Sequence, residues 1–296
     1  GIENNPVMYE LVSELPWRNA KFSWKEWLHD YVEARYGNIN NAKVHDAWLL
    51  LARSVYGAGA KIVEQGCHES VLCARPALDV YQVSSWSEME EFYNPDDVIR
   101  AAQLMVEASH EVKANANFRY DLVDITRQAI AEKARYVYAE IVAAYRAKDR
   151  KMFDYTTRRF LDIILQQDRL LSSIPDFMVG TWIRSARNLG TNTQESNHYE
   201  WNARVQITTW GNRDAAEKGG LREYAHKEWN GVLADFYYPR WKVYFEALVD
   251  TFDGKPMKNI DFYAMDEAWT LKHNVYPYEA QGDAVEFAQK AAAEVL

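Results

Sequence analysis

The sequence predicts an all-α protein, with roughly ten helices arranged as an irregular multi-helix bundle. Apolar residues recur at helical spacing along most of the 296 residues, and no alternation typical of a strand exceeds four residues. Hydrophobic residues make up 48% of the chain and charged residues 26%, which indicates a packed globular core. We expect a lead-in segment at 1–23 and a single helical domain at 24–296, interrupted by an irregular loop at 57–95.

The first helices are predicted from capping residues and periodicity. After a short helix at 7–15, Ser23 is followed three residues later by Glu26, which is the capping-box pattern of a helix start. Apolar residues then occupy one face as far as Gly37, a residue type that commonly ends helices. A second helix at 41–56 completes an antiparallel hairpin. Its core is expected to hold three tryptophans, Trp24, Trp27 and Trp48.

The segment 57–95 is the least regular part of the chain. Glycines and prolines interrupt it, and its mixed composition favours an ordered loop over a disordered one. Both cysteines of the chain, Cys67 and Cys73, lie here with a spacing that fits no zinc or redox motif. A local disulfide and two free thiols are both compatible with the sequence.

The remaining chain is predicted to form a succession of helices. Pro95, followed by two acidic residues, favours a helix that runs to Val112. Asn117 is expected to cap the next helix, whose periodicity extends through Tyr145. A helix beginning at Leu221 is expected to kink at Pro239, since proline lacks the backbone N–H. Further helices are expected at 153–171, 175–190, 260–273 and 282–295.

The most aromatic stretch of the chain is 206–241. Trp210 stands where an apolar run meets a glycine-containing break, which places it at a helix end. Leu221 and Tyr224 are expected to open the next helix. An indole face can pack on the C–H face of a sugar ring, and a phenol oxygen can reach a sugar hydroxyl. The alternative is that these aromatic side chains are core.

Several charged residues have a simpler interpretation as surface groups. Glu223 and His226 are expected on the solvated face of a helix, and Arg240 is expected to stack on an aromatic ring in a packed kink. Four residues of one helix are expected to form helix-surface or interdomain ion pairs: Arg119, Asp121, Asp124 and Arg127.

Composition excludes several classes of function. The formal net charge of −9 argues against nucleic acid or an anionic membrane surface as a partner. No apolar run reaches the length of a membrane span. No HExxH, GxGxxG, Walker or GxSxG motif occurs, and neither a metal nor a cofactor is expected.

A family resemblance rests on the order of several segments along nearly the whole chain. These segments are 47–56, 118–129, 180–182, the Trp210–Gly211 turn and 237–241. Together they resemble the C-terminal α-helical domain of the α-N-acetylglucosaminidases, the family 89 glycoside hydrolases that include the lysosomal heparan-sulfate enzyme. The resemblance implies a secreted, periplasmic or lysosomal parent protein.

The resemblance also implies that the catalytic residues lie in another domain of the parent protein. In this family of retaining enzymes, both catalytic glutamates lie on an N-terminal (β/α)8 barrel, and the nucleophile immediately precedes the segment that matches Gly1. The lead-in at 1–23 would then come from that barrel, and this chain alone would be inactive. Its expected partners are the barrel and a glycan ending in α-linked N-acetylglucosamine. The chain would close one wall of the pocket that binds this terminal sugar. Because the net charge of −9 does not suit a long sulfated polysaccharide, we expect the chain to contact only the terminal sugar. The alternative is a purely structural or oligomerisation domain without sugar contact.

Four substrate-binding residues follow from the resemblance. Trp210 carries over because Trp-Gly follows the family's upstream pattern, here Tyr199, Asn202, Arg204, Gln206 and Thr208. Tyr224 carries over through the Tyr-Ala pair, with Leu221 as an apolar wall, although the turn between Trp210 and Leu221 is longer than the family pattern. His68 matches a pocket histidine after a one-residue gap, whereas Cys67 matches without it. A loop histidine with a structural hydrogen bond is the alternative for His68.

Overall fold

The computed structural model describes residues 5–18, 21–57, 69–80, 83–84 and 92–296. Within these ranges every regular element is helical, which confirms the all-α prediction. The α-helices are α1 Pro6–Glu14, α2 Trp24–Tyr36, α3 Ala42–Arg53, α4 Pro95–Val112, α5 Ala116–Arg146, α6 Arg150–Leu171, α7 Val179–Arg187, α8 Thr193–Gln206, α9 Arg213–Glu217, α10 Tyr238–Phe252, α11 Phe262–Thr270 and α12 Ala284–Val295. Short 3-10 turns occupy Leu15–Trp17, Val71–Cys73 and Pro175–Phe177, and a π-helix spans Leu233–Tyr237.

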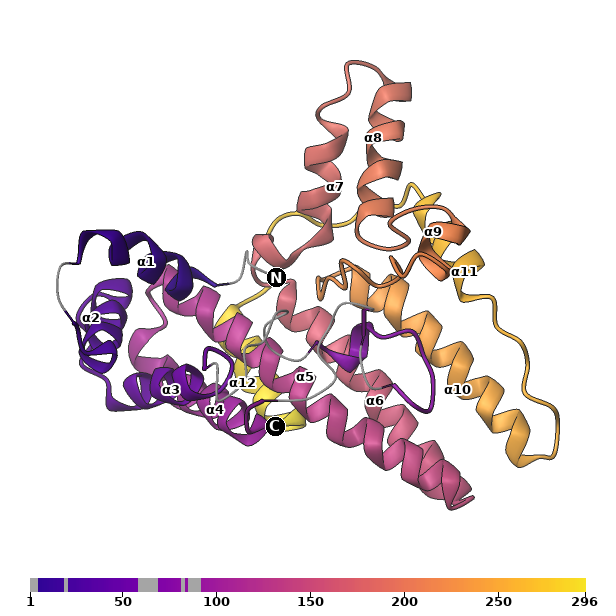
Figure 1. Cartoon of the computed structure of the whole chain (residues 1–296), viewed down its shortest axis with the longest axis horizontal. Coiled ribbons are helices and arrows are strands. Elements are labelled where there is room, and N and C mark those ends of the chain that lie inside the picture. Colours follow the sequence, from indigo (N-terminus) through magenta and orange to yellow (C-terminus); the bar gives the residue numbers. More distant parts are fainter. Residues whose placement is uncertain (1–4, 19–20, 58–68, 81–82, 85–91) are drawn as a thin grey trace.

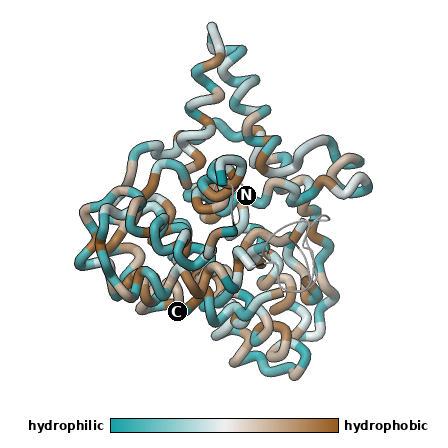
Figure 2. The backbone as a smooth tube through the Cα atoms, turned by 60° about the vertical axis from the view of Figure 1, so that its left-hand side comes forward, coloured by the Kyte–Doolittle hydropathy of each residue, from teal (hydrophilic) through white to brown (hydrophobic). Residues whose placement is uncertain are grey.

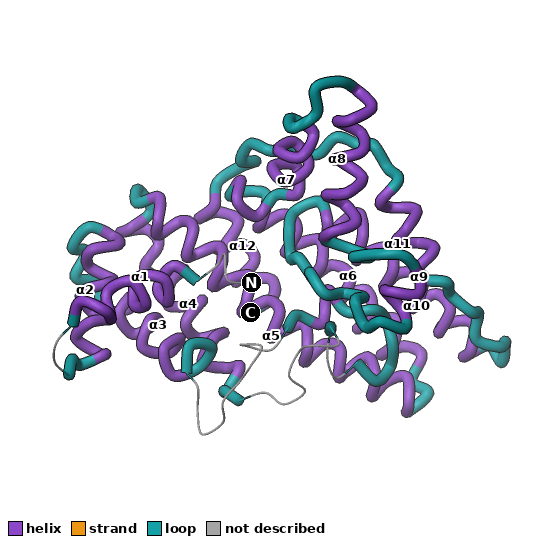
Figure 3. Tube along the Cα trace, turned by 45° about the horizontal axis from the view of Figure 1, so that its top comes forward, coloured by secondary structure: helices purple, strands orange, loops and turns teal. Residues whose placement is uncertain are grey.

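Two long antiparallel helices, α5 and α6, form the centre of the molecule (Figure 1). Helices α4 and α12 pack on α5, and α10 packs on α6. The hairpin of α2 and α3 lies at one end of the molecule, with α3 against α4. The pair α7 and α8 projects from the top of the body in Figure 1, and α9 and α11 lie beside the base of α8. Figure 3 shows loop segments gathering beside α9 and α11, where the candidate site lies.

Local signals explain most of the helix starts. Ser23 accepts a hydrogen bond from the backbone N–H of Glu26 at 3.4 Å, and Gly37 ends α2 with a φ of +86°, as expected. The prediction that Asn117 caps α5 is wrong. Asn115 accepts the N–H of Phe118 at 2.9 Å instead, because α5 begins two residues earlier than the pattern indicated.

The core between α6 and α10 is aromatic. The ring of Phe160 meets that of Trp241 with centroids 4.8 Å apart, and Phe245 lies 5.3 Å from Trp241. Trp241 is fully buried, and its indole N–H donates to the carbonyl of Leu72 at 3.1 Å. This bond satisfies the polar end of a buried aromatic and anchors the described part of the 57–95 loop to the bundle. Figure 2 shows hydrophobic and hydrophilic residues alternating along the helices, as amphipathic packing requires.

Two predictions, one in the N-terminal hairpin and one on α5, need correction. Trp27 and Trp48 are buried, but Trp24 is 49% exposed at the first position of α2, outside the hairpin core. Asp121 is not a surface residue, because it is 3% exposed and binds the Arg35 guanidinium at 2.5 and 2.9 Å. A buried carboxylate requires such a partner, and Tyr36 adds an O–H donor at 2.7 Å.

Of the two cysteines, Cys73 is described and is a free, buried thiol. Burial and the charge of Glu228 raise its pKa well above the ordinary value, so it is an inert core group. Cys67 and His68 lie outside the described residues. None of the described helices is both long and apolar enough to cross a membrane.

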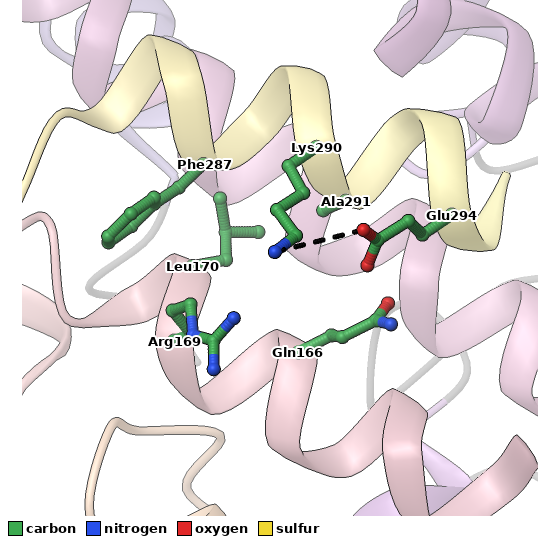
Figure 4. A pocket seen from close by; sticks show the side chains of 7 residues that line it. All are labelled: Gln166, Arg169, Leu170, Phe287, Lys290, Ala291 and Glu294. Carbon is green, nitrogen blue, oxygen red and sulfur yellow. Dashed lines mark ion pairs between the residues drawn. The ribbon is translucent and has the colours of Figure 1, made fainter.

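A shallow surface hollow lies between α6 and α12 (Figure 4). Leu170, Phe287 and Ala291 form its apolar floor, and an ion pair between Lys290 and Glu294, 3.8 Å apart, crosses its rim. It is a gap between packed helices, and none of the described sugar-binding candidates, Trp210, Leu221 and Tyr224, lines it.

Candidate functional site

Trp210 lies at a helix end, as the sequence predicts. Helix α8 ends at Gln206, and the backbone N–H of Trp210 donates back to the carbonyl of Val205 at 2.8 Å. The residue has a φ of +58°, a left-handed conformation that costs a side-chain-bearing residue about 1–2 kcal/mol. Asn212 then caps α9, so the strained turn is fixed on both sides. The indole is thereby held outward, 40% exposed to solvent.

The predicted helix at the start of 221–236 does not form. Residues 221–230 are turns and irregular backbone, in which Glu223 has a φ of +56° and His226 a φ of +29°. The backbone N–H of Tyr224 donates to the carbonyl of Leu221 at 3.2 Å, closing a tight turn. A helix would carry Glu223 on a solvated face, whereas here its carboxylate is buried against Arg240. The tertiary ion pair therefore overrides the local helical pattern.

The turn brings two of the predicted site residues into contact. The rings of Trp210 and Tyr224 have centroids 5.1 Å apart and planes tilted by 44°. Tyr224 is 43% exposed, and Leu221 is half-buried in the same turn. Because 5.1 Å is direct aromatic contact, no sugar ring fits between the two side chains. They form one continuous aromatic surface.

Beneath this surface lies a cluster of charged side chains, the arginine–carboxylate cluster: Arg75, Glu217, Glu223, Arg240 and Asp266. Arg240 is 1% exposed and makes two hydrogen bonds to the Glu223 carboxylate, one of them at 3.2 Å. Arg75 donates to both oxygens of Glu217, at 2.6 and 2.7 Å, and comes within 3.6 Å of Asp266. The expectation that Glu223 is solvated is wrong. Arg240 does stack on a ring, with its guanidinium 4.8 Å from the centroid of Phe236.

One acid of the arginine–carboxylate cluster, Asp266, has a raised pKa. Burial raises the pKa of Asp266 to about 7, with Glu223 adding to the shift and Arg240 opposing it. A perturbed acid near an exposed aromatic surface is a common sign of catalysis. Asp266 and Glu223 are 3% exposed each, however, so neither side chain reaches a molecule on the surface. The cluster is a support that fixes the turn carrying Tyr224.

The 57–95 loop also contacts this region. Glu69 accepts from the backbone N–H and the hydroxyl of Ser84, at 2.8 and 3.1 Å, and lies 3.3 Å from the imidazole of His226. This places Glu69 against the segment that follows Tyr224. Sequence reasoning missed Glu69, Arg75 and Asp266, because their partners are distant in sequence. The Arg75–Pro76 pair was the one available signal.

Comparisons with known proteins agree with the helical fold. The family model "Alpha-N-acetylglucosaminidase (NAGLU) C-terminal domain" matches residues 27–294. Human alpha-N-acetylglucosaminidase is 32% identical over 297 residues, which cover 98% of this chain and 38% of the human protein. A solved family 89 glycoside hydrolase from Clostridium perfringens, in complex with 2-acetamido-1,2-dideoxynojirmycin, matches with a TM-score of 0.93 and 31% identity over 98% of this chain. A Clostridium perfringens structure with two Glu-to-Gln substitutions, bound to its substrate GlcNAc-alpha-1,4-galactose, matches with the same TM-score and identity over 98% of this chain.

These matches first show the class of the protein: the chain is a helical domain of a glycoside hydrolase. More particularly, the chain belongs to the family of α-N-acetylglucosaminidase C-terminal domains. It spans 38% of the length of the human relative, and 34% and 33% of the two solved Clostridium perfringens chains.

Proposed function

We propose that this chain is the helical domain of a retaining exo-α-N-acetylglucosaminidase and closes one wall of the pocket for a terminal α-linked N-acetylglucosamine. The observation that carries the proposal is the exposed Trp210–Tyr224 surface. Two large aromatic rings stay 40% and 43% exposed although they touch. A strained backbone at Trp210 and a buried ion pair next to Tyr224 hold them there. The substrate named for the Clostridium perfringens relative, GlcNAc-alpha-1,4-galactose, supports this choice of sugar.

Each predicted residue has a distinct role in this proposal. The indole of Trp210 packs on the C–H face of the sugar, and the Tyr224 hydroxyl reaches a sugar hydroxyl. Leu221 supplies an apolar wall beside them. His68, which lies outside the described residues, supplies one further hydrogen bond to the sugar.

The two catalytic carboxyl groups belong, in this proposal, to a (β/α)8 barrel elsewhere in the parent protein. Retaining glycosidases need a nucleophile and an acid/base about 5–5.5 Å apart at the scissile bond. Among the described residues near Trp210, the carboxylates of Glu217, Glu223 and Asp266 face arginines. The chain alone is therefore expected to be inactive.

The segment 1–23 is the proposed connection to the barrel, with 24–296 as one helical domain. Helix α1 and the following 3-10 turn expose several apolar side chains: Tyr9 at 52%, Val12 at 61%, Leu15 at 44% and Trp17 at 85%. Exposed apolar side chains gathered in one segment suit a packing surface for another domain. Self-association through the same side chains is the competing structural interpretation.

The test is Trp210→Ala in the intact parent enzyme, with kcat/KM for an aryl α-N-acetylglucosaminide and Tm as readouts. We expect kcat/KM to fall about tenfold or more, because one aromatic contact is lost, while Tm changes little. Trp201→Ala is the matched control, since Trp201 is 39% exposed and its ring packs on that of His198 within α8. Lost folding with unchanged constants in the folded fraction would favour a purely structural domain. Hydrolysis by this chain alone would refute the placement of both carboxyl groups on the barrel.

A further inference from the structure

Three side chains capable of binding a metal ion converge on the hairpin of α2 and α3. His29 and Glu33 lie four residues apart on one face of α2, and His45 reaches them from α3. One imidazole nitrogen of each histidine and one carboxylate oxygen of Glu33 all lie within 4.8 Å of one another. This group, the His–Glu–His cluster, is at the opposite end of the molecule from α8 and α9 (Figure 1).

The cluster is partly organised without an ion. The Nε2 atom of His45 lies 2.6 Å from a Glu33 oxygen, and both side chains are largely buried, at 16% and 14% exposure. The imidazoles of His29 and His45 stack with centroids 4.3 Å apart and planes within 10°. The Glu33 carboxylate also accepts the backbone N–H of Asn40 at 3.1 and 3.2 Å. Such outer hydrogen bonds fix the orientation of ligating side chains.

We propose that the His–Glu–His cluster binds one divalent first-row transition-metal ion, with zinc as the reference ion and water in the fourth position. Two imidazoles and one carboxylate are a donor set that suits Zn²⁺ and its neighbours in the series. Tetrahedral bonds of about 2.1 Å require donor atoms about 3.4 Å apart. The donor atoms that lie as much as 4.8 Å apart must therefore approach by up to about 1.4 Å, while the 2.6 Å contact between His45 and Glu33 must open. His29 has the freedom to do this, because its side chain is 57% exposed.

Binding has a defined chemical consequence in the hairpin. A neutral His45 that ligates through Nε2 carries its hydrogen on Nδ1, so binding moves the hydrogen shared between Nε2 and Glu33 to Nδ1 and leaves Nε2 and the carboxylate oxygen free to bind the ion. Since ligands come from both helices, the ion cross-links α2 to α3 near the turn that Asn40 closes. Metal that binds only the folded hairpin must stabilise it. The proposed role is structural and is independent of the sugar contact.

The test uses the full, untagged chain and Zn²⁺ alone, with isothermal titration calorimetry and thermal unfolding. We expect one ion per chain and a Tm that rises with Zn²⁺ concentration. His29→Gln and Glu33→Gln should each weaken Zn²⁺ binding at least about tenfold, since the loss of an outer hydrogen bond alone costs about 10- to 100-fold. His198→Gln is the matched control, because His198 is an exposed helical histidine outside the cluster. It should bind like the unmodified chain.

The outcomes separate clearly. Equal Zn²⁺ affinity in His29→Gln and in the unmodified chain would overturn the proposal, and so would the absence of saturable binding. If Glu33→Gln fails to fold because the charged contact with His45 is lost, His29→Gln carries the test alone. Visible absorption of bound Co²⁺ adds an independent readout, since His29→Gln must change it if His29 is a ligand.

Discussion

The buried pair of Glu223 and Arg240 should be the most sensitive point in the support of the aromatic surface. Arg240→Ala removes a guanidinium that is 1% exposed and leaves the Glu223 carboxylate, 2% exposed, without its main partner. Asp266 also loses a cation 3.5 Å away. Breaking a buried ion pair by deleting one partner costs about 3–5 kcal/mol, because the remaining charge stays buried.

The structure places the expected loss at the lower end of this range. Arg75 remains 3.8 Å from Glu223 and 3.6 Å from Asp266, so it compensates part of the lost charge. Its shortest bonds, at 2.6 and 2.7 Å, are to Glu217, which limits that compensation. We expect Arg240→Ala to lower the free energy of unfolding by about 3 kcal/mol.

The assay is urea unfolding followed by circular dichroism, with Arg213→Ala as the matched control. Arg213 also makes a two-bond pair with a carboxylate, that of Asp261, at 2.9 Å for each bond. The side chains of that pair are 51% and 50% exposed, so water replaces the lost contact and the loss should be much smaller. Equal losses in the two variants would refute the reasoning that burial, and not pairing alone, makes the Glu223–Arg240 contact important.

Two further predictions concern pH and packing. Between its ordinary pKa of 3.8 and its raised pKa of about 7, Asp266 keeps a proton in the folded state that the unfolded chain has lost, so stability falls as pH rises across this window. Asp266→Asn should remove up to about 4 kcal/mol of this fall, measured by urea unfolding at several pH values; an unchanged slope would contradict the assignment. Gly180→Ala would place its Cβ 2.0 Å from the carbonyl oxygen of Pro277, and should cost about 1–3 kcal/mol or more through backbone shifts. At Gly254 an added Cβ would meet no atom within 4 Å, so alanine there should cost only the strain of its left-handed backbone (φ +74°), about 1 kcal/mol. Equal Tm losses for the two variants would contradict the clash at Gly180.

The sequence by itself determined the helices that local signals define. The predicted helix from Pro95 to Val112 matches α4 at both ends, and the capping residue Ser23 and the stop at Gly37 lie where the pattern placed them. These signals act between residues up to four positions apart. A short window of sequence is therefore enough to recognise them. Short-range signals of the same kind predicted that Trp210 lies at a helix end.

The tertiary structure decided which charges are buried and what their burial does to the backbone. Asp121 pairs with Arg35 across 86 residues, and Glu223 pairs with Arg240 across 17, beyond the reach of any helical pattern. The second pair prevents a helix after Leu221 and brings Tyr224 into contact with Trp210. Desolvating a charge costs several kcal/mol unless it is paired, whereas helix propensities differ by well under about 1 kcal/mol per residue. Where the two conflict, the buried pair sets the local backbone, and only the folded chain reveals the pair.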